Sequence, residues 1–336
     1  MYVLGIETSC DETAISVVKD GNEVLSNVIF SQEKIHEAFG GVFPELASRS
    51  HLEAILPALE KALSDASLSL QQIDLIAVAA HPGLMGSLLM GVTASKALAF
   101  ALDKPFVAVN HIEAHLYVSL MKEPSFPALG LVVSGGHTSL YHITDETTYN
   151  LISQTVDDAI GEAFDKVARL LELPYPGGPH VEALAKTGDP KRYPFKEAFV
   201  KQDPLAFSFS GLKTQVFYAL QGKELSEQDR ADLAASFQET ALQMVVKKSL
   251  KVAKNLDTKS LYIGGGVSAN KRLRELFTQE SPLDLKIFWP PKGLSIDNGA
   301  MIAGLGYHLY KKKGASDLFD VSPEPTSRIK HLSFSE

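Results

Sequence analysis

The sequence predicts an α/β protein of two lobes, in which one pattern of strands and helices occurs twice. Each half reads strand, strand, strand, helix, strand, helix, strand, and glycine-rich turns follow several of the strands. The halves share this order without strong sequence identity, which indicates duplication of an ancestral unit. Ligands of such folds bind at the carboxyl ends of strands, so we expect the turns to line one central cleft between the lobes.

The first half begins with a meander of three strands. Apolar or alternating runs predict strands at 2–7, 14–19 and 23–30, and Asp20-Gly21-Asn22 is a hairpin turn signal. Residues 44–64 carry leucine and isoleucine at helical spacing, which predicts a helix. A buried strand at 73–79, a small-residue helix at 87–102 and a strand at 106–110 complete the half.

The second half repeats the meander and then departs from it once. The predicted elements are strands at 129–134, 138–143, 149–155, 261–263 and 286–289, and helices at about 158–171, 227–254, 270–277 and 297–311. The stretch 174–225 does not fit the repeat and reads as a loop-like insertion, because Pro and Gly punctuate it. We assign 1–125 with 300–325 to an N-terminal lobe and 126–299 to a C-terminal lobe, with the insertion near 174–225.

Composition favours a soluble cytoplasmic protein. The 336 residues are 45% hydrophobic and 21% charged, and no apolar run of membrane-spanning length or signal peptide is recognised, so no membrane association is expected. Cys10 is the only cysteine, which excludes an internal disulfide. The net charge of -8 disfavours a nucleic-acid binder that works alone, because phosphate contacts need clustered cations.

Two histidines and one aspartate are candidate metal ligands. His111 and His115 lie four residues apart, so they project from one face if a helix begins after the strand that ends at Asn110. Asp297 stands at the predicted start of the closing helix, and two His with one carboxylate suit Fe(II) or Zn(II). The alternatives are an ordinary histidine pair and a plain helix cap at Asp297.

Two glycine turns and an acidic turn are candidate substrate sites. The turn Ser134-Gly135-Gly136-His137-Thr138 offers backbone amides to an anion, and the alternative is a tight hairpin. Gly264-Gly265-Gly266 before a helix permits close approach of a nucleotide, without being a dinucleotide fingerprint or a P-loop. Asp11 and Glu12 in the first turn could bind a metal–phosphate or act as a base, or simply end a hairpin.

Taken together, these stretches closely resemble the TsaD family of tRNA N6-adenosine threonylcarbamoyltransferases of bacterial type. The runs that carry the resemblance, in family order, are 5–13, 40–49, 82–84, 110–115, 133–138, 161–166, 175–179, 209–214 and 264–270. Because they span nearly the whole chain, the set is far more specific than any one motif.

The resemblance implies a fold, ligands and partners. The fold is that of the actin-like ATPases, which include sugar kinases and Hsp70. One Fe(II) ion, or Zn(II), is implied at His111, His115 and Asp297. The implied substrate is threonylcarbamoyl-AMP from a separate synthase. Its implied contacts are Ser134, Gly135, Gly136, His137, Thr138, Asp165, Gly178, Glu182 and Asn270. Bacterial relatives work with TsaB and TsaE, and such partners would help an acidic chain to handle tRNA.

The implied reaction is attack by the exocyclic amine of the adenosine beside the anticodon, in tRNAs that read codons beginning with A. Candidates for the base are Asp11, Glu12 and His137, and Glu12 is preferred. An ATP-dependent small-molecule kinase of the same fold is the main rival, although it has no use for the two histidines. A metalloprotease is disfavoured because the His-Glu-x-x-His order is absent, and a non-catalytic scaffold because the metal residues are intact.

Overall fold

The computed structural model describes residues 1–326 except 199, 202, 223 and 224. The chain forms two compact units. Unit 1 contains Met1–Ser125, Thr144–Tyr149 and the described residues from Pro290 onward, and unit 2 contains Phe126–Ile143 and the described residues of Asn150–Trp289. Residues 290–299, which the sequence analysis grouped with the C-terminal lobe, therefore belong to unit 1, and this group includes Asp297.

Unit 1 is built on a five-stranded mixed sheet in the order β3-β2-β1-β4-β5. Its strands are β1 (Tyr2–Glu7), β2 (Glu12–Lys19), β3 (Glu23–Ser31), β4 (Leu75–His81) and β5 (Phe106–Asn110). The strand β2 pairs antiparallel with both β1 and β3, and β4 and β5 continue the sheet parallel to β1. Each strand predicted in the first half is present, because nearly continuous apolar runs are typical of strands buried on both faces.

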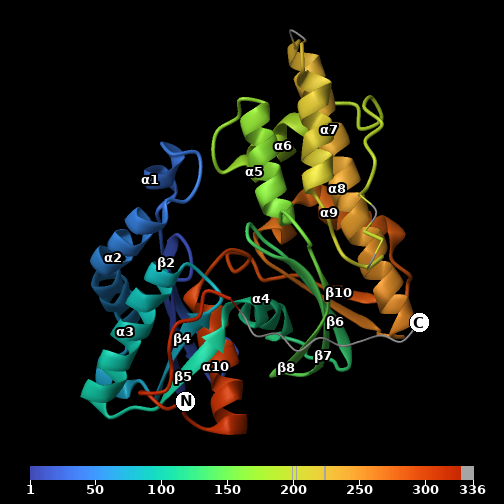
Figure 1. Ribbon diagram of the computed structural model, residues 1–336. Coiled ribbons are helices and arrows are strands. Elements are labelled where there is room, and N and C mark those ends of the chain that lie inside the picture. The colour runs from blue at the N-terminus through green and yellow to red at the C-terminus, as the bar shows by residue number, and fades with distance from the viewer. Residues whose placement is uncertain (199, 202, 223–224, 327–336) are drawn as a thin grey trace. The chain divides into compact units, whose positions relative to one another are not determined.

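Helices cover both faces of the unit 1 sheet. They are α1 (Glu33–Glu37), α2 (Pro44–Asp65), α3 (Met85–Leu102), α4 (His111–Leu120) and α10 (Gly299–Lys313). The helices α2 and α3 pack together against β2 and β4, and α4 and α10 pack together with α10 across β1 (Figure 1). The core between these layers holds Leu4, Ile6, Ile15, Val78 and Phe106.

Unit 2 repeats the same strand order. Its strands are β6 (Ala128–Val133), β7 (Thr138–Asp145), β8 (Thr148–Gln154), β9 (Ser260–Gly264) and β10 (Lys286–Phe288), in the order β8-β7-β6-β9-β10. Because β6 pairs antiparallel to β7 and parallel to β9, it stands where β1 stands in unit 1. The predicted duplication of an α/β unit is confirmed by this identical order.

Five helices belong to unit 2, among the residues that are described. They are α5 (Ile160–Leu170), α6 (Gly177–Ala185), α7 (Ser210–Leu220), α8 (Glu227–Asn255) and α9 (Lys271–Glu280). The prediction that 174–225 is loop-like is wrong in part, because α6 and α7 lie within it. Proline is tolerated in the first turn of a helix, where its missing N–H has no partner, so Pro179 does not prevent α6.

The helix α3 is long and apolar enough, by length and composition alone, to cross a membrane. The sequence analysis did not recognise such a run. A core helix of a soluble protein passes the same test, and α3 packs on α2 and β4. Its Lys96 donates a hydrogen bond of 2.5 Å from Nζ to the carbonyl oxygen of Val321.

Candidate active site

The two histidines come from the first two turns of α4, which begins directly after β5. Asn110 ends the strand and caps the helix, since its Oδ1 accepts hydrogen bonds from the amides of Ile112 (2.8 Å) and Glu113 (3.2 Å). The helix therefore starts at His111, and His115 follows one turn later on the same face. The two imidazole rings lie 4.6 Å apart between centroids.

Asp297 comes from the turn that precedes α10. The helix begins at Gly299 rather than at the predicted 297, and Asn298 is the cap. Asn298 Oδ1 accepts from the amide of Met301 at 2.9 Å, and its Nδ2 donates to the carbonyls of Leu294 and Ile296. The alternative that Asp297 is a plain helix cap is wrong, so its carboxylate is available for other contacts.

Close approach of α10 to β1 depends on two glycines. A Cβ atom on Gly5 would lie 2.1 Å from the carbonyl oxygen of Gly299, and one on Gly299 would lie 2.6 Å from the amide of Ser16. No larger side chain fits at either position, because such distances fall well inside van der Waals contact. These glycines bring the start of α10, and with it Asp297, against the sheet edge where Glu7 ends β1.

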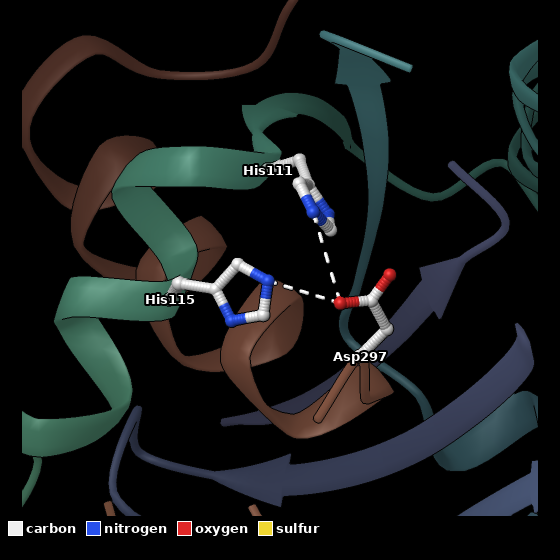
Figure 2. Close-up of side chains that lie close together, drawn as sticks. All are labelled: His111, His115 and Asp297. Atoms are coloured by element: carbon white, nitrogen blue, oxygen red, sulfur yellow. Dashed lines mark ion pairs between the residues drawn. The ribbon is translucent and has the colours of Figure 1, made fainter. Parts of the chain in front are cut away.

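The three candidate ligands meet in unit 1 (Figure 2). Nε2 of His115 lies 3.0 Å and Nε2 of His111 3.8 Å from Oδ1 of Asp297, and one ligand atom of each residue lies within 4.8 Å of the others. His115 is 1% exposed; its Nε2 faces the carboxylate of Asp297, and its Nδ1 has no hydrogen-bond partner among the described residues. Buried polar atoms in proteins rarely lack a hydrogen-bond partner. Two imidazoles and a carboxylate suit Fe(II) or Zn(II), so these residues fit a divalent ion.

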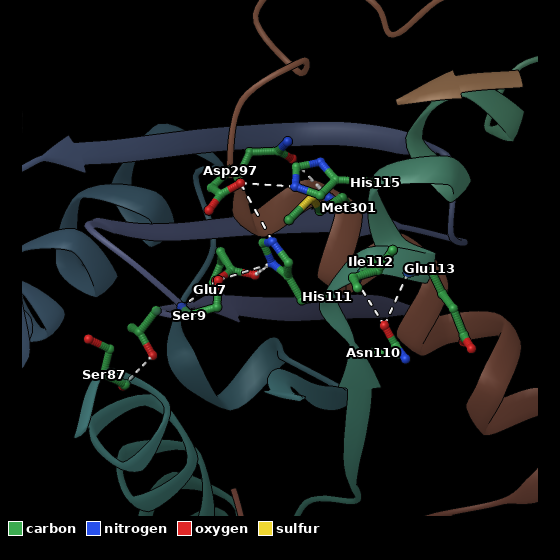
Figure 3. Close-up of polar contacts among 12 residues, drawn as sticks. Glu7, Ser9, Ser87, Asn110, His111, Ile112, Glu113, His115, Asp297 and Met301 are labelled. Carbon is green, nitrogen blue, oxygen red and sulfur yellow. Dashed lines mark hydrogen bonds and ion pairs between the residues drawn. The ribbon is translucent and has the colours of Figure 1, made fainter. Parts of the chain in front are cut away.

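A fourth residue, Glu7, orients His111 by contacting Nδ1, the ring nitrogen that does not face Asp297 (Figure 3). Its Oε2 accepts a hydrogen bond of 2.8 Å from Nδ1 of His111, and its Oε1 accepts from the amide of Ser9 at 2.5 Å. Nδ1 therefore carries a proton, and Nε2 is the nitrogen that faces Asp297. Burial would lower the pKa of His111, but the charges of Glu7 and Asp297 outweigh it and raise that pKa to about 9.

Asp11 lies in the loop between β1 and β2, and Glu12 is the first residue of β2. His51 of α2 contacts this region twice, at the strand through Nδ1 to Thr13 Oγ1 (2.8 Å) and at the loop through Nε2 to the carbonyl oxygen of Cys10 (3.0 Å). Burial, followed by the charges of Asp297 and Asp11, raises the pKa of Glu12 well above its ordinary value. A bound cation would relieve this accumulation of carboxylates.

Glu113 stands apart from this cluster. Its side chain points away from the two histidines, toward the opposite side of α4 (Figure 3). Burial raises the pKa of Glu113 to about 7, against a lowering influence from Lys313. The arrangement of a zinc protease, in which a glutamate on the same helix attends the metal-bound water, is therefore not formed by this residue.

In unit 2, the glycine turn after β6 is closed upon itself. The amide of Ser134 donates to the carbonyl of His137 at 2.8 Å, and the amide of His137 donates to Oγ of Ser134 at 3.1 Å. Gly135 and Gly136 between them are exposed, and a Cβ atom on either would meet nothing within 4 Å. Within the described residues, neither glycine amide has a hydrogen-bond partner, so both can receive an anion or a carbonyl oxygen.

Other predicted substrate residues of unit 2 hold helix starts around this turn. Thr138 is fully buried, and its Oγ1 accepts from the amide of Ile160 at 2.8 Å. Asp165 accepts from the amide of Gly177 at 2.7 Å, which fixes the first turn of α6 beside α5. Gly178 in that turn faces open space.

Glu182 and Asn270 meet at the start of α9. Oε1 of Glu182 accepts from the amide of Lys271 at 3.0 Å. Asn270 caps α9 through Leu273 (3.0 Å) and donates from Nδ2 to Gln238 at 2.9 Å. The predicted residues thus form two groups, each within one unit: Asp11, Glu12, His111, His115 and Asp297 in unit 1, and Ser134–Thr138, Asp165, Gly178, Glu182 and Asn270 in unit 2.

Sequence reasoning missed Glu7, His51 and Asn298. Glu7 carried a signal, because an acidic residue at the end of an otherwise apolar buried strand needs a buried partner. Asn298 also carried one, because Asn directly before a helix is a preferred cap. His51 had no signal beyond its place on the buried face of α2.

Comparisons with known proteins agree with this architecture. The family model for TsaD, tRNA N6-adenosine threonylcarbamoyltransferase, matches residues 23–304. A relative of that name from Protochlamydia amoebophila is 53% identical over 333 residues, covering 96% of this chain and 97% of its own. One from Bacillus subtilis is 46% identical over 332 residues, covering 97% and 95%.

A solved structure with the same fold is that of T. kodakarensis HypF. It aligns with a TM-score of 0.64 at 15% sequence identity, over 95% of this chain and 49% of that chain. At this identity the likeness establishes the fold alone, and the fold is the predicted one of the actin-like ATPases.

Proposed function

Because the chain belongs to the family of tRNA N6-adenosine threonylcarbamoyltransferases, we propose that it modifies the adenosine adjacent to the anticodon, in tRNAs that read codons beginning with A. The observation that carries the proposal is near-full-length identity of 53% to a relative of that name. The donor is threonylcarbamoyl-AMP.

The reaction is an acyl transfer. The exocyclic amine of adenosine attacks the carbamoyl carbon, a C–N bond forms, and the C–O bond to phosphate breaks. AMP leaves, and the proton of the amine passes to a base. The chain must therefore hold an anionic leaving group, stabilise negative charge on the carbamoyl oxygen, and accept one proton.

The glycine turn of unit 2 supports the first two tasks. The exposed amides of Gly135 and Gly136 can donate to the phosphate or to the carbamoyl oxygen, and Ser134 and His137 close the turn behind them. The first turn of α6, at Gly178, adds a helix N-terminus that favours negative charge. Loss of one preorganised donor of this kind typically costs about 3 kcal/mol in the transition state.

We propose that His111, His115 and Asp297 hold one Fe(II) ion, with Zn(II) as the alternative. The support is the donor set, the buried ring of His115, whose Nδ1 has no hydrogen-bond partner in the described part of the chain, and the carboxylate of Glu7 at Nδ1 of His111. When bound, such an ion acts as a Lewis acid that orients and polarises donor oxygens. The chain's own contribution is to fix the imidazoles and keep Nε2 of His111 directed at the site.

Glu12 is our preferred base, ahead of Asp11 and His137. Its carboxyl is close enough to Asp297 and Glu7 to be affected by their charges, and its pKa is raised mainly by burial. A base is most effective when its pKa is near the working pH, and an ordinary exposed glutamate is too weak. The replacement Glu12→Gln should preserve metal and adenylate binding and abolish transfer, and full activity would remove Glu12 from the mechanism.

We further propose partners in the cytoplasm: a separate synthase for the adenylate, and TsaB-like and TsaE-like proteins. An exposed apolar face of unit 1 supports a protein partner. Leu52 and Leu56 on α2 are 69% and 65% exposed, and Met85 and Leu89 on α3 are 48% and 43% exposed. Apolar patches of this kind commonly mark protein interfaces.

The kinase alternative is not favoured, because relatives of 46–53% identity over nearly the whole chain carry the transferase name. The proposal is tested by transfer of labelled threonine from synthetic threonylcarbamoyl-AMP to unmodified tRNA, with and without a chelator and the partner proteins. We expect label in tRNA and loss of transfer with the chelator. Phosphorylation of a small molecule from ATP, with no label in tRNA, would contradict the proposal.

A further inference from the structure

An irregular segment of unit 2, residues 189–196, is held in place by side chains of two helices. From α8, Asp232 accepts from the amide of Asp189 (2.8 Å), and Ser236 accepts from the amide of Tyr193 (3.2 Å). From α7, Gln215 accepts from the amide of Lys196 and donates to its carbonyl, both at 2.9 Å. A loop whose backbone is fixed at both ends has little backbone entropy left to lose on binding.

The segment carries three cations that the protein does not neutralise. Lys191, Arg192 and Lys196 are exposed, and none of them forms an ion pair with any described residue. Cations nearby differ in this respect, since Lys213 pairs with Asp158 at 3.4 Å and Lys247 with Glu197 at 3.1 Å. In a chain of net charge -8, three unpaired cations within six residues form a local site for phosphates.

Aromatic side chains accompany these cations. The rings of Tyr193 and Phe195 stack, with centroids 5.9 Å apart and an angle of 14° between their planes, and they pack on the core of unit 2. On α7, Gln215 faces Lys196, and Tyr218 follows three residues later with 65% of its surface exposed. Tyr193 and Phe195 are half-buried, so Tyr218 is the exposed ring of the three, and an exposed ring beside cations is the combination that binds unpaired nucleic-acid bases.

The segment begins close to the candidate adenylate residues. The helix α6 starts at the Asp165 contact and ends at Ala185, four residues before Asp189. Nine helical residues span about 14 Å, so a bound polynucleotide could reach both. Protein partners are the other candidate class, but unpaired cations with an exposed ring favour a polyanion.

We propose that the 189–196 segment and the adjacent face of α7 bind the anticodon arm of the tRNA substrate. Lys191, Arg192 and Lys196 contact phosphates, and Tyr218 stacks on an unpaired base. The inference rests on the proposed function, because the tRNA is its substrate, and it assigns that substrate a surface.

The test compares three variants of the full chain in binding unmodified tRNA at several salt concentrations. The variant K191A/R192A/K196A should bind at least tenfold more weakly, and its slope of log affinity against log salt should fall by about 2. Y218A should lose about tenfold in affinity with the slope unchanged. The matched control R169A/K254A/K286A removes three exposed cations elsewhere on unit 2 and should bind within about twofold of wild type.

Further measurements separate this surface from the proposed function. Adenylate binding, and transfer at saturating tRNA, should be unchanged in all variants, and the charge-preserving K191R/R192K/K196R should retain affinity. The assignment of this surface would be overturned if the triple variant and the control lost tRNA affinity equally. It would also be overturned if the triple variant kept its tRNA affinity and lost binding to a protein partner. A wild-type chain that transfers no label would overturn the proposed function instead.

Discussion

At the scale of single residues, the unit 1 cluster depends on a hydrogen bond between two buried side chains. Glu7 is fully buried at the end of β1, and its carboxylate fixes the ring of His111 through Nδ1. Partners behind metal-binding histidines set both the tautomer and the ring orientation. The residue at position 7 should therefore affect metal affinity without touching the ion.

Glu7→Gln should weaken metal binding by about 10- to 100-fold, because the neutral amide is a poorer acceptor for Nδ1–H. Competition with a chromogenic chelator measures the affinity directly. The matched control is Glu23→Gln, an exposed glutamate on β3 of the same unit, which should leave affinity unchanged. Equal affinities for wild type and Glu7→Gln would show that Glu7 has only a structural role.

Residue types and local spacing predicted part of this cluster. The interval between His111 and His115 predicts a shared helix face without further information, and the structure confirms that helix. Asp297 was a candidate ligand from its place at the predicted helix start, and the family resemblance implied the same set, but its proximity to the histidines could not be derived from spacing. It depends on the contact of Gly5 with Gly299, which joins distant parts of the chain and leaves no local pattern.

At the scale of secondary-structure elements, Asn298 links the stability of α10 to the position of Asp297. Its side chain is fully buried and makes three hydrogen bonds, one to the helix and two to the preceding turn. A change here should therefore affect both stability and the metal site.

Asn298→Ala should lower the free energy of unfolding by about 1–2 kcal/mol and also weaken metal binding. Chemical denaturation and chelator competition report the two effects. Ser226→Ala is the matched control, because Ser226 caps α8 in unit 2 and its loss should destabilise without changing metal affinity. Destabilisation by Asn298→Ala with unchanged metal affinity would contradict the link.

The start of α5 provides a prediction of pH dependence. Burial works to raise the pKa of Asp158, but hydrogen bonds and charges from Lys166, Ser210 and Lys213 outweigh it and lower that pKa. A carboxyl group whose pKa is lowered in the folded state stabilises the fold when the pH is above its unfolded pKa of about 3.9. This contribution is lost as the pH falls through the folded pKa.

Asp158→Asn should therefore lower the free energy of unfolding by about 1 kcal/mol at pH 6–7, and the difference from wild type should shrink as the pH falls through the lowered folded pKa of Asp158. Denaturation curves across this range test it. Glu162→Gln removes the other, 45% exposed partner of Lys166 and should have almost no effect. A deficit for Asp158→Asn that stays constant with pH would contradict the electrostatic origin.

Elements with strong periodicity were predicted well, and short elements in the insertion were not. Strands β1 to β5 follow apolar runs, whereas α6 opens with Gly177-Gly178-Pro179, residues that locally favour a turn. The side chain of Asp165 compensates by accepting from the first amide of α6. Such tertiary support is invisible in a local reading of the sequence.

At the scale of the whole molecule, the repeated strand order gives each unit a sheet of the same topology with different side chains at its strand ends. Unit 1 carries the metal candidates and unit 2 the glycine turn. The family resemblance predicted this fold from motifs spread along the chain. The boundary near residue 290 was not predicted, although Pro290, Pro291 and Gly293 are a loop signal, because such a signal marks a loop without indicating which unit the loop packs on.

The apolar face on α2 and α3 predicts a partner for the whole chain. Close packing of Ser48 against Gly86 brings the two helices together beside Leu52 and Met85. Replacing both Leu52 and Leu56 by Lys should abolish association with a TsaB-like protein in sedimentation experiments and leave adenylate binding intact. Leu283→Lys changes a fully exposed leucine of unit 2 and serves as control. Persistent association of the double variant would exclude this face.

The central claim is that His111, His115 and Asp297 hold one divalent ion, and elemental analysis of the purified chain tests it most directly. After loading with Fe(II) without oxygen and removal of unbound metal, the wild type should retain about one ion per chain. His115→Ala and Asp297→Ala, folded by the same criteria, should retain almost none. Equal metal content in wild type and variants, or none in the wild type, would contradict the claim.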